Sequence, residues 1–404
     1  MMQKAVIVAP WFGVNSGGAE IALLKIAEGL RRLDHDVEIY TTRSQTPYGD
    51  WLENPEPRPD EHVAGFPVRR FAVEAEGLDR YRLAVATMSQ GRDLTRIQRD
   101  DFFRYGMTST DLVTALKALP ADVKILGGPY YQALIHNVVA ALPGRVFVMP
   151  AFHEEPPFRF EAIGRLLRDA RGLLFLTETE KRMVIRTHAV SLDRNKLETP
   201  VLSLPHVNEA DVGRDNRHEL LRRLLDSYMI YVGRIDEGKN INQLVQWHHQ
   251  ASLERQKAGL KPIMLVLAGK GAGLSFESPF VRAIGFVSEE EKRALIADSL
   301  GLVNISRNES FSFVLFEAWQ LNVPVIVHTD CTVMRNHIEI GKGGYSCRTA
   351  AEYAAALREF ERPEMRRILA ANGRGYGDRI CDTDRFLTRL AQIIGMPTDA
   401  KVTA

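Results

Sequence analysis

The sequence has few cysteines, and this excludes two kinds of small stabilised domain. Only three cysteines occur among 404 residues, and all lie in the last quarter: Cys331, Cys347 and Cys381. An odd number at wide spacing matches neither a disulfide framework nor a zinc site. A reducing, cytoplasmic environment is therefore the expected setting.

Long apolar runs and an excess of one charge are also missing. No stretch of about 18 uncharged apolar residues occurs, so the sequence predicts no membrane-spanning helix. The apolar run Ala5–Ala9 is too short for a secretory signal peptide. The formal net charge is only +1, so the whole-chain balance gives no support to nucleic-acid binding.

The sequence does contain enough apolar material for two domains. Apolar residues make up 45% and charged residues 25% of the chain, which is typical of a globular protein. A length of 404 residues suits two domains of about 200 residues each. Regular patterning lapses near residues 205–216. We therefore expect an N-terminal domain over residues 1–205 and a C-terminal domain over residues 206–404, whose last helix is free to pack back on the first domain.

Both halves alternate between strand-like and helical patterns. Ala5–Ala9 is a short continuous apolar run, typical of a buried parallel strand, and Val37–Thr41 is the next one. The alternation resumes at Met229–Val232 and continues to Pro324–Val327. Such alternation predicts an α/β fold: two Rossmann-like, doubly wound domains facing each other across a cleft, with C-terminal helices. Ligands of such sheets bind at the carboxyl ends of the strands.

One stretch, from about residue 43 to residue 120, interrupts this alternation. Its first part is crowded with prolines, which argues against regular elements there. Its second part is rich in arginine between Arg80 and Arg104. These arginines are able to rest on an anionic membrane surface. The alternative is a solvated helical face whose charge is offset by neighbouring aspartates, namely Asp79, Asp93, Asp100 and Asp101.

The most informative motif is the segment 308–317, which joins a strand-like run to an apolar helix. Backbone N–H groups at a helix start are unpaired and favour anions, so a phosphate fits there. Ser310 and Ser312 are small enough to let a diphosphate approach the backbone. Glu309 lies where a carboxylate can hold sugar hydroxyls, and Glu317, two turns on, can reach a ribose. The alternative is a capped surface helix with ordinary carboxylates.

A second segment, Gly233–Asn240, also joins a strand end to a helix start. Its Arg234 can bind a diphosphate through two parallel hydrogen bonds, and its Lys239 can bind as a point charge. The alternative for both is a solvated loop charge.

Two segments of the first half have a similar position. The loop Asn15–Glu20 precedes a helix, and its glycines allow a phosphate or sugar to approach closely. This loop lacks the spacing of a dinucleotide fingerprint or a P-loop. His153 follows a strand and can hydrogen-bond a sugar or act as an acid or base, although a lone histidine is often structural. No cluster of histidine and carboxylate residues demands a metal.

Together these four motifs resemble the retaining glycosyltransferases of the GT-B group, in the large family usually called family four, or group 1. The resemblance covers nearly the whole chain except about residues 43–120. It implies a nucleotide-diphosphate sugar as substrate and no cofactor or metal. It also implies that Arg234 and Lys239 bind the donor diphosphate, with Phe311, Ser312 and the Gly18 loop beside it.

The resemblance assigns the remaining roles to three residues. It implies that Glu309 contacts the transferred sugar, that His153 lies near its C6 position, and that Glu317 holds the nucleotide ribose. Glu309 and His153 are thus the expected catalytic residues. The family commonly shows a glycine pair before an acidic residue where this chain has residues 329–334. Because that loop contacts the donor sugar in the family, the sequence does not predict which sugar is transferred.

The predicted function is therefore sugar transfer to a glycan, lipid-linked or other acceptor, in polysaccharide or glycoconjugate biosynthesis. The arginines from Arg80 to Arg104 would give peripheral contact with the inner face of the membrane. Two alternatives remain: a sugar-nucleotide epimerase or phosphorylase on the same scaffold, and a non-catalytic binding protein of this fold.

Overall fold

The chain divides into two compact units. The first comprises Met1–Pro205 and Asp382–Ala404, and the second comprises His206–Cys381. The computed structural model describes residues 3–13, 17–44, 46, 50–58, 60–198, 200–205, 227–271 and 277–396. Most of the predicted boundary at residues 205–216, and residues 14–16 of the first glycine loop, lie outside these ranges.

The first unit is built on a seven-stranded sheet with the order β3-β4-β2-β1-β5-β6-β7. Its strands are β1 (Gln3–Ala9), β2 (His35–Thr42), β3 (His62–Val63), β4 (Phe66–Phe71), β5 (Lys124–Gly127), β6 (Val146–Val148) and β7 (Gly172–Leu173). All pairs are parallel except β3 with β4. Since β1 lies between β2 and β5, the strand order reverses there. The loops after β1 and β5 thus leave the sheet at its topological switch point, where ligands bind in such folds.

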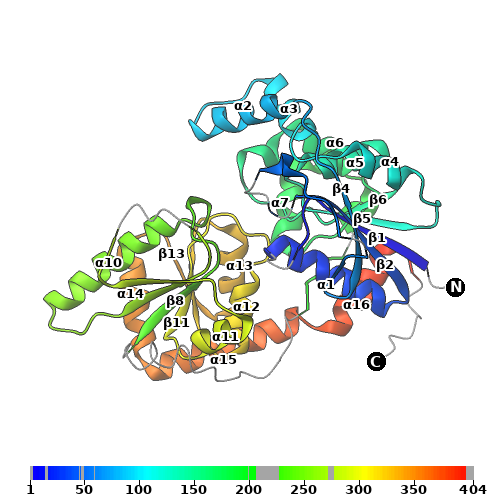
Figure 1. Cartoon of the computed structure of the whole chain (residues 1–404). Coiled ribbons are helices and arrows are strands. Elements are labelled where there is room, and N and C mark those ends of the chain that lie inside the picture. Colours follow the sequence, from blue (N-terminus) through cyan, green and yellow to red (C-terminus); the bar gives the residue numbers. More distant parts are fainter. Residues whose placement is uncertain are drawn as a thin grey trace. The chain divides into compact units, whose positions relative to one another are not determined.

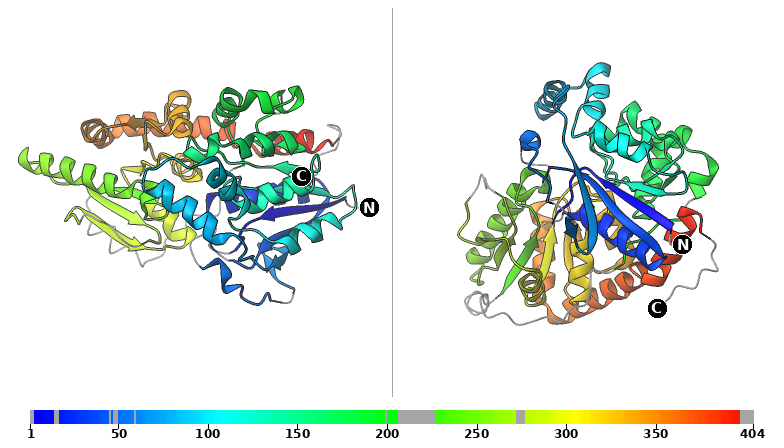
Figure 2. Two further views of the ribbon diagram at one scale, coloured as in Figure 1. Left: turned by 90° about the horizontal axis from the view of Figure 1, so that it is seen from above. Right: turned by 45° about the vertical axis from the view of Figure 1, so that its right-hand side comes forward.

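Helices cover both faces of this sheet. One apolar core joins Val6 and Val8 of β1 to the helices that follow β4. These are α2 (Leu78–Ser89), α3 (Arg96–Arg104), α4 (Thr110–Lys117), α5 (Ala133–Ala141), α6 (Glu161–Asp169) and α7 (Glu178–His188); the short α8 (Arg194–Glu198) follows them. On the other face lie α1 (Gly18–Arg32) and α16 (Thr383–Ile394), side by side in Figures 1 and 2. A Cβ atom on Gly29 would lie 2.6 Å from Cε1 of Phe386, so glycine permits this close packing.

The stretch from residue 43 to residue 120 is more regular than predicted. Its β4 is a full strand of the sheet, and α2, α3 and α4 follow it. The prediction of irregular structure is wrong there because Pro67 does not prevent strand pairing. Pro67 is the second residue of β4, and the ladder with β2 begins at the next residue, where Val68 lies opposite Ile39. The missing N–H group of the proline therefore removes no bond from that ladder.

The second unit is built on a parallel six-stranded sheet with the order β10-β9-β8-β11-β12-β13. Its strands are β8 (Tyr228–Val232), β9 (Met264–Ala268), β10 (Val281–Gly285), β11 (Gly301–Asn304), β12 (Val325–His328) and β13 (Gly344–Cys347). The switch point falls between β8 and β11, because β8 lies between β9 and β11.

Helices cover both faces of this second sheet as well. They are α10 (Ile241–Lys257), α11 (Glu289–Ala297), α12 (Phe313–Gln320), α13 (Thr332–Gly341), α14 (Ala350–Glu361) and α15 (Pro363–Ile380). Met229 and Tyr231 of β8 pack in one core with α10 and α14, and Ile230 between them is equally buried. Burial of successive residues is typical of a parallel strand between two layers of helices. The predicted fold class, two Rossmann-like α/β domains, is confirmed.

Helix α15 was not predicted, because it contains three glycines, which are poor helix formers. Tertiary packing explains one of them. A Cβ atom on Gly373 would lie 2.2 Å from Cδ1 of Trp319, which is fully buried in α12. The indole Nε1 of Trp319 donates to the carbonyl of Gly343 at 2.9 Å, so the ring is fixed in place. Glycine at position 373 thus makes room for a side chain from another helix.

We expect Gly373→Ala to lower the free energy of unfolding by about 3 kcal/mol, because the methyl group overpacks the indole. Gly375→Ala is the matched control on the same helix. Its Cβ would meet only Nη1 of Arg379, at 3.6 Å, and alanine there should stabilise the helix by up to about 1 kcal/mol. Urea denaturation of both variants checks this difference. Equal effects would show that Trp319 does not impose the glycine.

Candidate functional site

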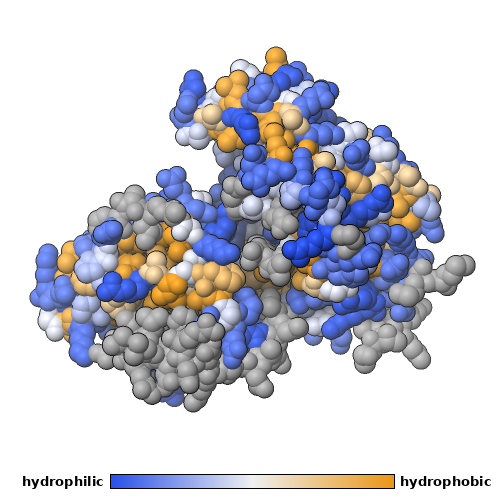
Figure 3. Space-filling view, in the orientation of Figure 1, coloured by the Kyte–Doolittle hydropathy of each residue, from blue (hydrophilic) through white to orange (hydrophobic). Residues whose placement is uncertain are grey.

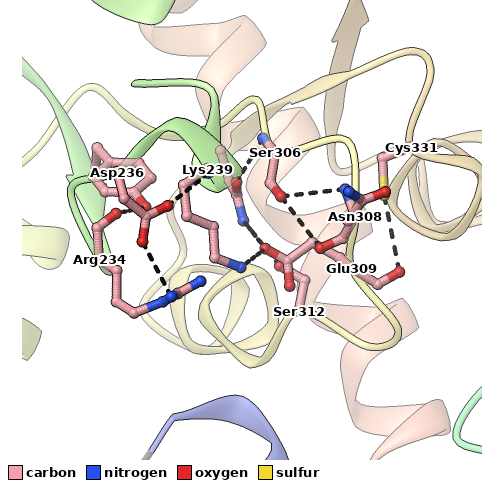
Figure 4. A network of polar contacts seen from close by, with 10 residues as sticks. Arg234, Asp236, Lys239, Ser306, Asn308, Glu309, Ser312 and Cys331 are labelled. Atoms are coloured by element: carbon pink, nitrogen blue, oxygen red, sulfur yellow. Dashed lines mark hydrogen bonds and ion pairs between the residues drawn. The ribbon is translucent and has the colours of Figure 1, made fainter. Parts of the chain in front are cut away.

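Two loops of the second unit carry most of the predicted site residues. Arg234 and Lys239 follow β8, whereas Glu309 and Ser312 follow β11 (Figure 4). Because β8 and β11 are neighbouring parallel strands, their carboxyl ends bring both loops to the switch point of the sheet. The structure thus joins two motifs that the sequence separates by 70 positions.

The central contact of this cluster is an ion pair. Nζ of Lys239 lies 2.7 Å from Oε1 of Glu309, and these side chains are only 21% and 15% exposed. The side-chain amide of Asn304 donates to the same Oε1 at 3.3 Å and to Oγ of Ser312 at 3.2 Å. The carboxylate of Glu309 is therefore held in one orientation. An ammonium group has three donors, so Lys239 can keep this bond while it also binds a phosphate oxygen.

Asp236 organises the two cationic residues. Its Oδ2 lies 3.1 Å from Nη1 of Arg234, and its Oδ1 accepts a hydrogen bond from the backbone N–H of Lys239 at 3.0 Å. The hydroxyl of Tyr231 donates to the carbonyl of Arg234 at 2.7 Å and fixes the backbone. Arg234 and Lys239 are thus presented from one short turn, which suits a ligand that carries two neighbouring phosphates.

The start of α12 completes the cluster. Its N-cap residue, Ser312, has a φ of 64°, in the left-handed region that non-glycine residues seldom adopt. The hydroxyl of Ser312 accepts from Asn304 rather than capping the helix. Phe311 is buried and stacks on Phe316 with ring centroids 4.7 Å apart, so only its backbone is available to a ligand. The helix start therefore offers backbone N–H groups beside the two cations, an arrangement that favours an anion.

Glu317 is held separately from this cluster. It lies on α12, and its Oε2 is 2.9 Å from Nζ of Lys292 on α11. Lys292 also contacts Oε2 of Glu289 at 2.6 Å. Burial alone would lower the pKa of Lys292, but the two carboxylates outweigh it and raise that pKa above its usual value. Glu317 therefore faces a charged ammonium group at neutral pH.

His153 lies on the first unit, in the loop that follows β6. Its Nδ1 is 3.1 Å from Oε1 of Glu155, and the hydroxyl of Tyr130 donates to that same oxygen at 2.6 Å. Tyr130 follows the neighbouring strand β5, so the carboxylate ties two adjacent loops together. A carboxylate at Nδ1 favours the tautomer that carries its proton there, which leaves Nε2 able to accept a hydrogen bond.

A fully buried carboxylate supports the His153 loop. Glu180 of α7 accepts hydrogen bonds from the backbone N–H groups of Phe152, at 2.9 Å, and Leu176, at 2.7 Å. It thereby fixes the segments that follow β6 and β7. Burial raises the pKa of Glu180 to about 7, and the hydrogen bonds only partly oppose that shift.

We expect the stability of the native protein to fall, relative to Glu180→Gln, as the pH rises from 5 to 8. The pKa of Glu180 is raised from 4.5 to about 7 in the folded state, so the folded state binds the extra proton between these values. The stability that this proton contributes is fully present below pH 4.5, the unfolded-state pKa, and is lost as the pH rises above about 7, the folded-state pKa. The loss amounts to about 3 kcal/mol.

Urea denaturation at pH 5 and pH 8 checks this expectation. Glu178→Gln is the control, because Glu178 is exposed and lies on the same helix. A difference between the native protein and Glu180→Gln that stays constant with pH would show that Glu180 does not titrate in this range.

The glycine loop of the first unit is organised by another carboxylate. Gly18 is the first residue of α1, and a Cβ there would meet nothing within 4 Å. Oε1 of Glu20 accepts from Nε1 of Trp11 at 2.5 Å, and its Oε2 accepts from the N–H of Gly17 at 3.1 Å. The predicted site residues therefore form two sets, with His153 and Gly18 on the first unit and the others on the second.

Several residues of these clusters were not predicted from the sequence. Asp236 lies between Arg234 and Lys239, so the motif itself contained that signal. Asn304 ends a strand and Lys292 lies in an ordinary charged helix, and neither position carries a local pattern. No sequence pattern marks Glu180 either, because its burial depends on the fold.

Other kinds of site are few in the part of the chain that the structure describes. No group of three or more histidine, cysteine or acidic residues within these ranges is arranged to hold a metal ion. None of the described helices is long and apolar enough to span a membrane. All three cysteines are buried and free, and burial raises the pKa of Cys331 and of Cys347 to about 12.

Comparison with solved structures shows which fold this is. The α,α-trehalose 6-phosphate synthase of Burkholderia multivorans is 11% identical, with a TM-score of 0.72 over 98% of each chain. The sucrose-phosphate synthase of Thermosynechococcus elongatus is 15% identical, with a TM-score of 0.66 over 96% of this chain and 98% of that one. WaaG, a glycosyltransferase involved in lipopolysaccharide biosynthesis, is 15% identical, with a TM-score of 0.65 over 96% of this chain and 99% of that one. At such identities the likeness shows the fold alone, which is GT-B.

The sequence comparison adds the family. Residues 226–361 match the family model described as "Glycosyl transferases group 1". The chain therefore has the GT-B fold, and residues 226–361 form a group 1 glycosyltransferase domain. This domain lies within the second unit and includes the motifs around Arg234 and Glu309, so the resemblance is confirmed for that part of the chain. A search of curated protein sequences found no significant match.

Proposed function

We propose that the chain is a retaining glycosyltransferase whose donor diphosphate binds at the switch point of the second unit. The observation that carries this proposal is the cluster of Arg234, Lys239 and Glu309 beside the start of α12. Two cations and a helix N-terminus suit a diphosphate, and a fixed carboxylate suits the hydroxyls of the adjoining sugar.

The proposed catalysis is electrostatic. Negative charge grows on the diphosphate as its bond to the sugar breaks, and Arg234, Lys239 and the N–H groups of α12 are preorganised to stabilise it. We propose that these groups suffice without a metal ion. Glu309 accepts hydrogen bonds from the transferred sugar and positions it, while Glu317 accepts from the ribose.

The acceptor hydroxyl is proposed to attack the same face of the sugar from which the diphosphate departs. The new bond joins the acceptor oxygen to the anomeric carbon as the bond to the phosphate oxygen breaks. The hydroxyl proton passes to the departing phosphate. Because attack and departure occur on the same face, the configuration of the anomeric carbon is retained. His153 would accept a hydrogen bond from a sugar hydroxyl through Nε2, since Nδ1 is directed to Glu155.

A thermal-shift panel of UDP, GDP, ADP and common nucleotide sugars, with and without EDTA, tests this proposal. A ligand that binds only the folded state raises apparent stability by RT ln(1 + [L]/Kd), which gives a shift of several degrees. We expect one nucleotide class to shift the transition and EDTA to leave that shift unchanged. No shift with any nucleotide would contradict the donor site, and a shift lost in EDTA would contradict metal independence.

Product analysis separates this function from the two alternatives. An epimerase would interconvert the nucleotide sugar without an acceptor, and a phosphorylase would require free phosphate. A non-catalytic binding protein would bind the nucleotide but leave the donor intact. Transfer with the α or β configuration of the donor preserved in the product is the expected result.

We propose further that the acceptor is a glycan or lipid-linked molecule reached at an anionic membrane surface, on its inner face. Support comes from α2 and α3, which carry arginines and where Leu83 is 59% and Ile97 is 67% exposed. Figure 3 shows hydrophobic surface beside hydrophilic surface over this region. The salt bridges Arg80–Asp101 and Arg96–Glu161 offset part of that charge. Apolar side chains surrounded by basic ones suit a membrane interface.

Co-sedimentation with vesicles checks the membrane proposal. We expect binding to phosphatidylglycerol vesicles that weakens with salt, and less binding for Leu83→Ser with Ile97→Ser. Leu253→Ser is the control, because Leu253 is an exposed leucine on α10. Equal binding to phosphatidylcholine vesicles, or none to either, would contradict the proposal.

A further inference from the structure

Lys292 is an almost buried lysine that the proposed chemistry does not use. It lies on α11, and its Nζ is 2.9 Å from Glu317 and 2.6 Å from Glu289. The side chain of Lys292 is 13% exposed, and those of Glu317 and Glu289 are 11% and 73% exposed. Water screens the contact with Glu289 but hardly reaches the contact with Glu317. The significant partner of Lys292 is therefore Glu317.

We infer that Lys292 is a positioning residue that holds the Glu317 carboxylate in the orientation required by the ribose hydroxyls, and so sets the preference for a ribonucleotide. This inference rests on the proposed role of Glu317. Lys292 itself is assigned no contact with the nucleotide.

The chemistry of a ribose explains why the orientation of the carboxylate matters. The 2′ and 3′ hydroxyls are best held as donors by an ionised carboxylate, which accepts through both oxygens, whereas a protonated carboxyl loses part of that capacity. The Glu317 side chain is only 11% exposed, and Nζ of Lys292 lies 2.9 Å from its Oε2. An ammonium group this close to one oxygen restricts the rotation of the carboxylate.

The ion pair between Lys292 and Glu317 also has a simpler interpretation, as a structural tie that only holds α11 against α12. The two interpretations differ in what they do to nucleotide binding. A mere tie would change the affinity for ribonucleotides and deoxyribonucleotides alike, because the shape of the whole site would alter. A positioning residue would change only the part of the affinity that depends on the ribose hydroxyl.

Isothermal titration calorimetry distinguishes these cases. The ligands are whichever of UDP, GDP or ADP binds in the thermal-shift panel, and its 2′-deoxy and 3′-deoxy forms. We expect the native protein to prefer the ribonucleotide to at least one deoxy form by about tenfold, as for a hydrogen-bonded hydroxyl. Lys292→Met should reduce this preference to about twofold or less, with deoxynucleotide affinity nearly unchanged. Lys292→Arg should restore the preference in part, and Glu289→Gln should retain it.

Each other result has a definite meaning. If the native protein shows no preference, the proposed role of Glu317 is wrong and the inference fails with it. If the native protein shows the preference and Lys292→Met keeps it, the role of Glu317 stands and the inference about Lys292 is overturned. An equal loss of affinity for both ligands would show a structural tie only. If Lys292→Met does not fold, Lys292→Gln gives the same comparison.

Discussion

Replacing Glu309 with glutamine is expected to lower the rate of sugar transfer by about 100-fold or more, because one preorganised polar partner of the reacting sugar is lost. The affinity for the nucleoside diphosphate should change by less than about threefold, since the diphosphate is assigned to Arg234, Lys239 and the start of α12. Steady-state kinetics and calorimetry measure the two quantities separately. A fall in kcat without a fall in affinity is the expected signature.

The amide of glutamine keeps the shape of the side chain, so the comparison isolates the charge and the second acceptor oxygen. Glu364→Gln is the matched control, because Glu364 is exposed in the first turn of α15. Near-normal turnover of Glu309→Gln would show that the carboxylate has no role in the reaction. Loss of turnover and of nucleotide affinity together would instead assign Glu309 to holding Lys239 in place.

Lys239→Ala is expected to weaken nucleoside diphosphate binding by about 100-fold, or about 3 kcal/mol. Two effects add in this variant. The diphosphate loses a cation, and Glu309 loses the ammonium 2.7 Å from its Oε1, so an uncompensated carboxylate lies beside the phosphates. Calorimetry at two salt concentrations measures the loss, and the salt dependence of binding should decrease with it.

The double variant separates these two effects. If repulsion from Glu309 contributes, Lys239→Ala combined with Glu309→Gln should bind the nucleotide more tightly than Lys239→Ala alone. Lys257→Ala is the control, because Lys257 is an exposed lysine at the end of α10. A loss of less than about threefold in Lys239→Ala would contradict its assignment to the diphosphate.

Part of the fold followed directly from local sequence patterns. Short apolar runs predicted β1 and β8, and helical spacing predicted α1 and α11, because each pattern depends only on the period of its own element. The same patterns did not predict β4 or α15. Pro67 and Gly373 are unfavourable locally. Pro67 is tolerated because the ladder with β2 begins at the next residue, and Gly373 because the indole of Trp319 occupies the space of a side chain.

The candidate site divides in the same way. The sequence by itself determined the two loops of the second unit, because a strand, a turn and a helix start are local features. Arg234, Lys239 and Glu309 could be singled out because each falls in such a loop.

Only the tertiary structure decided which side chains meet. Lys239 pairs with Glu309 because β8 lies beside β11, an order of strands that no local pattern encodes. Glu317 pairs with Lys292 because two helices pack together. The physical reason is that a charged side chain acquires its partner and its burial from neighbours in space, whereas periodicity records only neighbours along the chain.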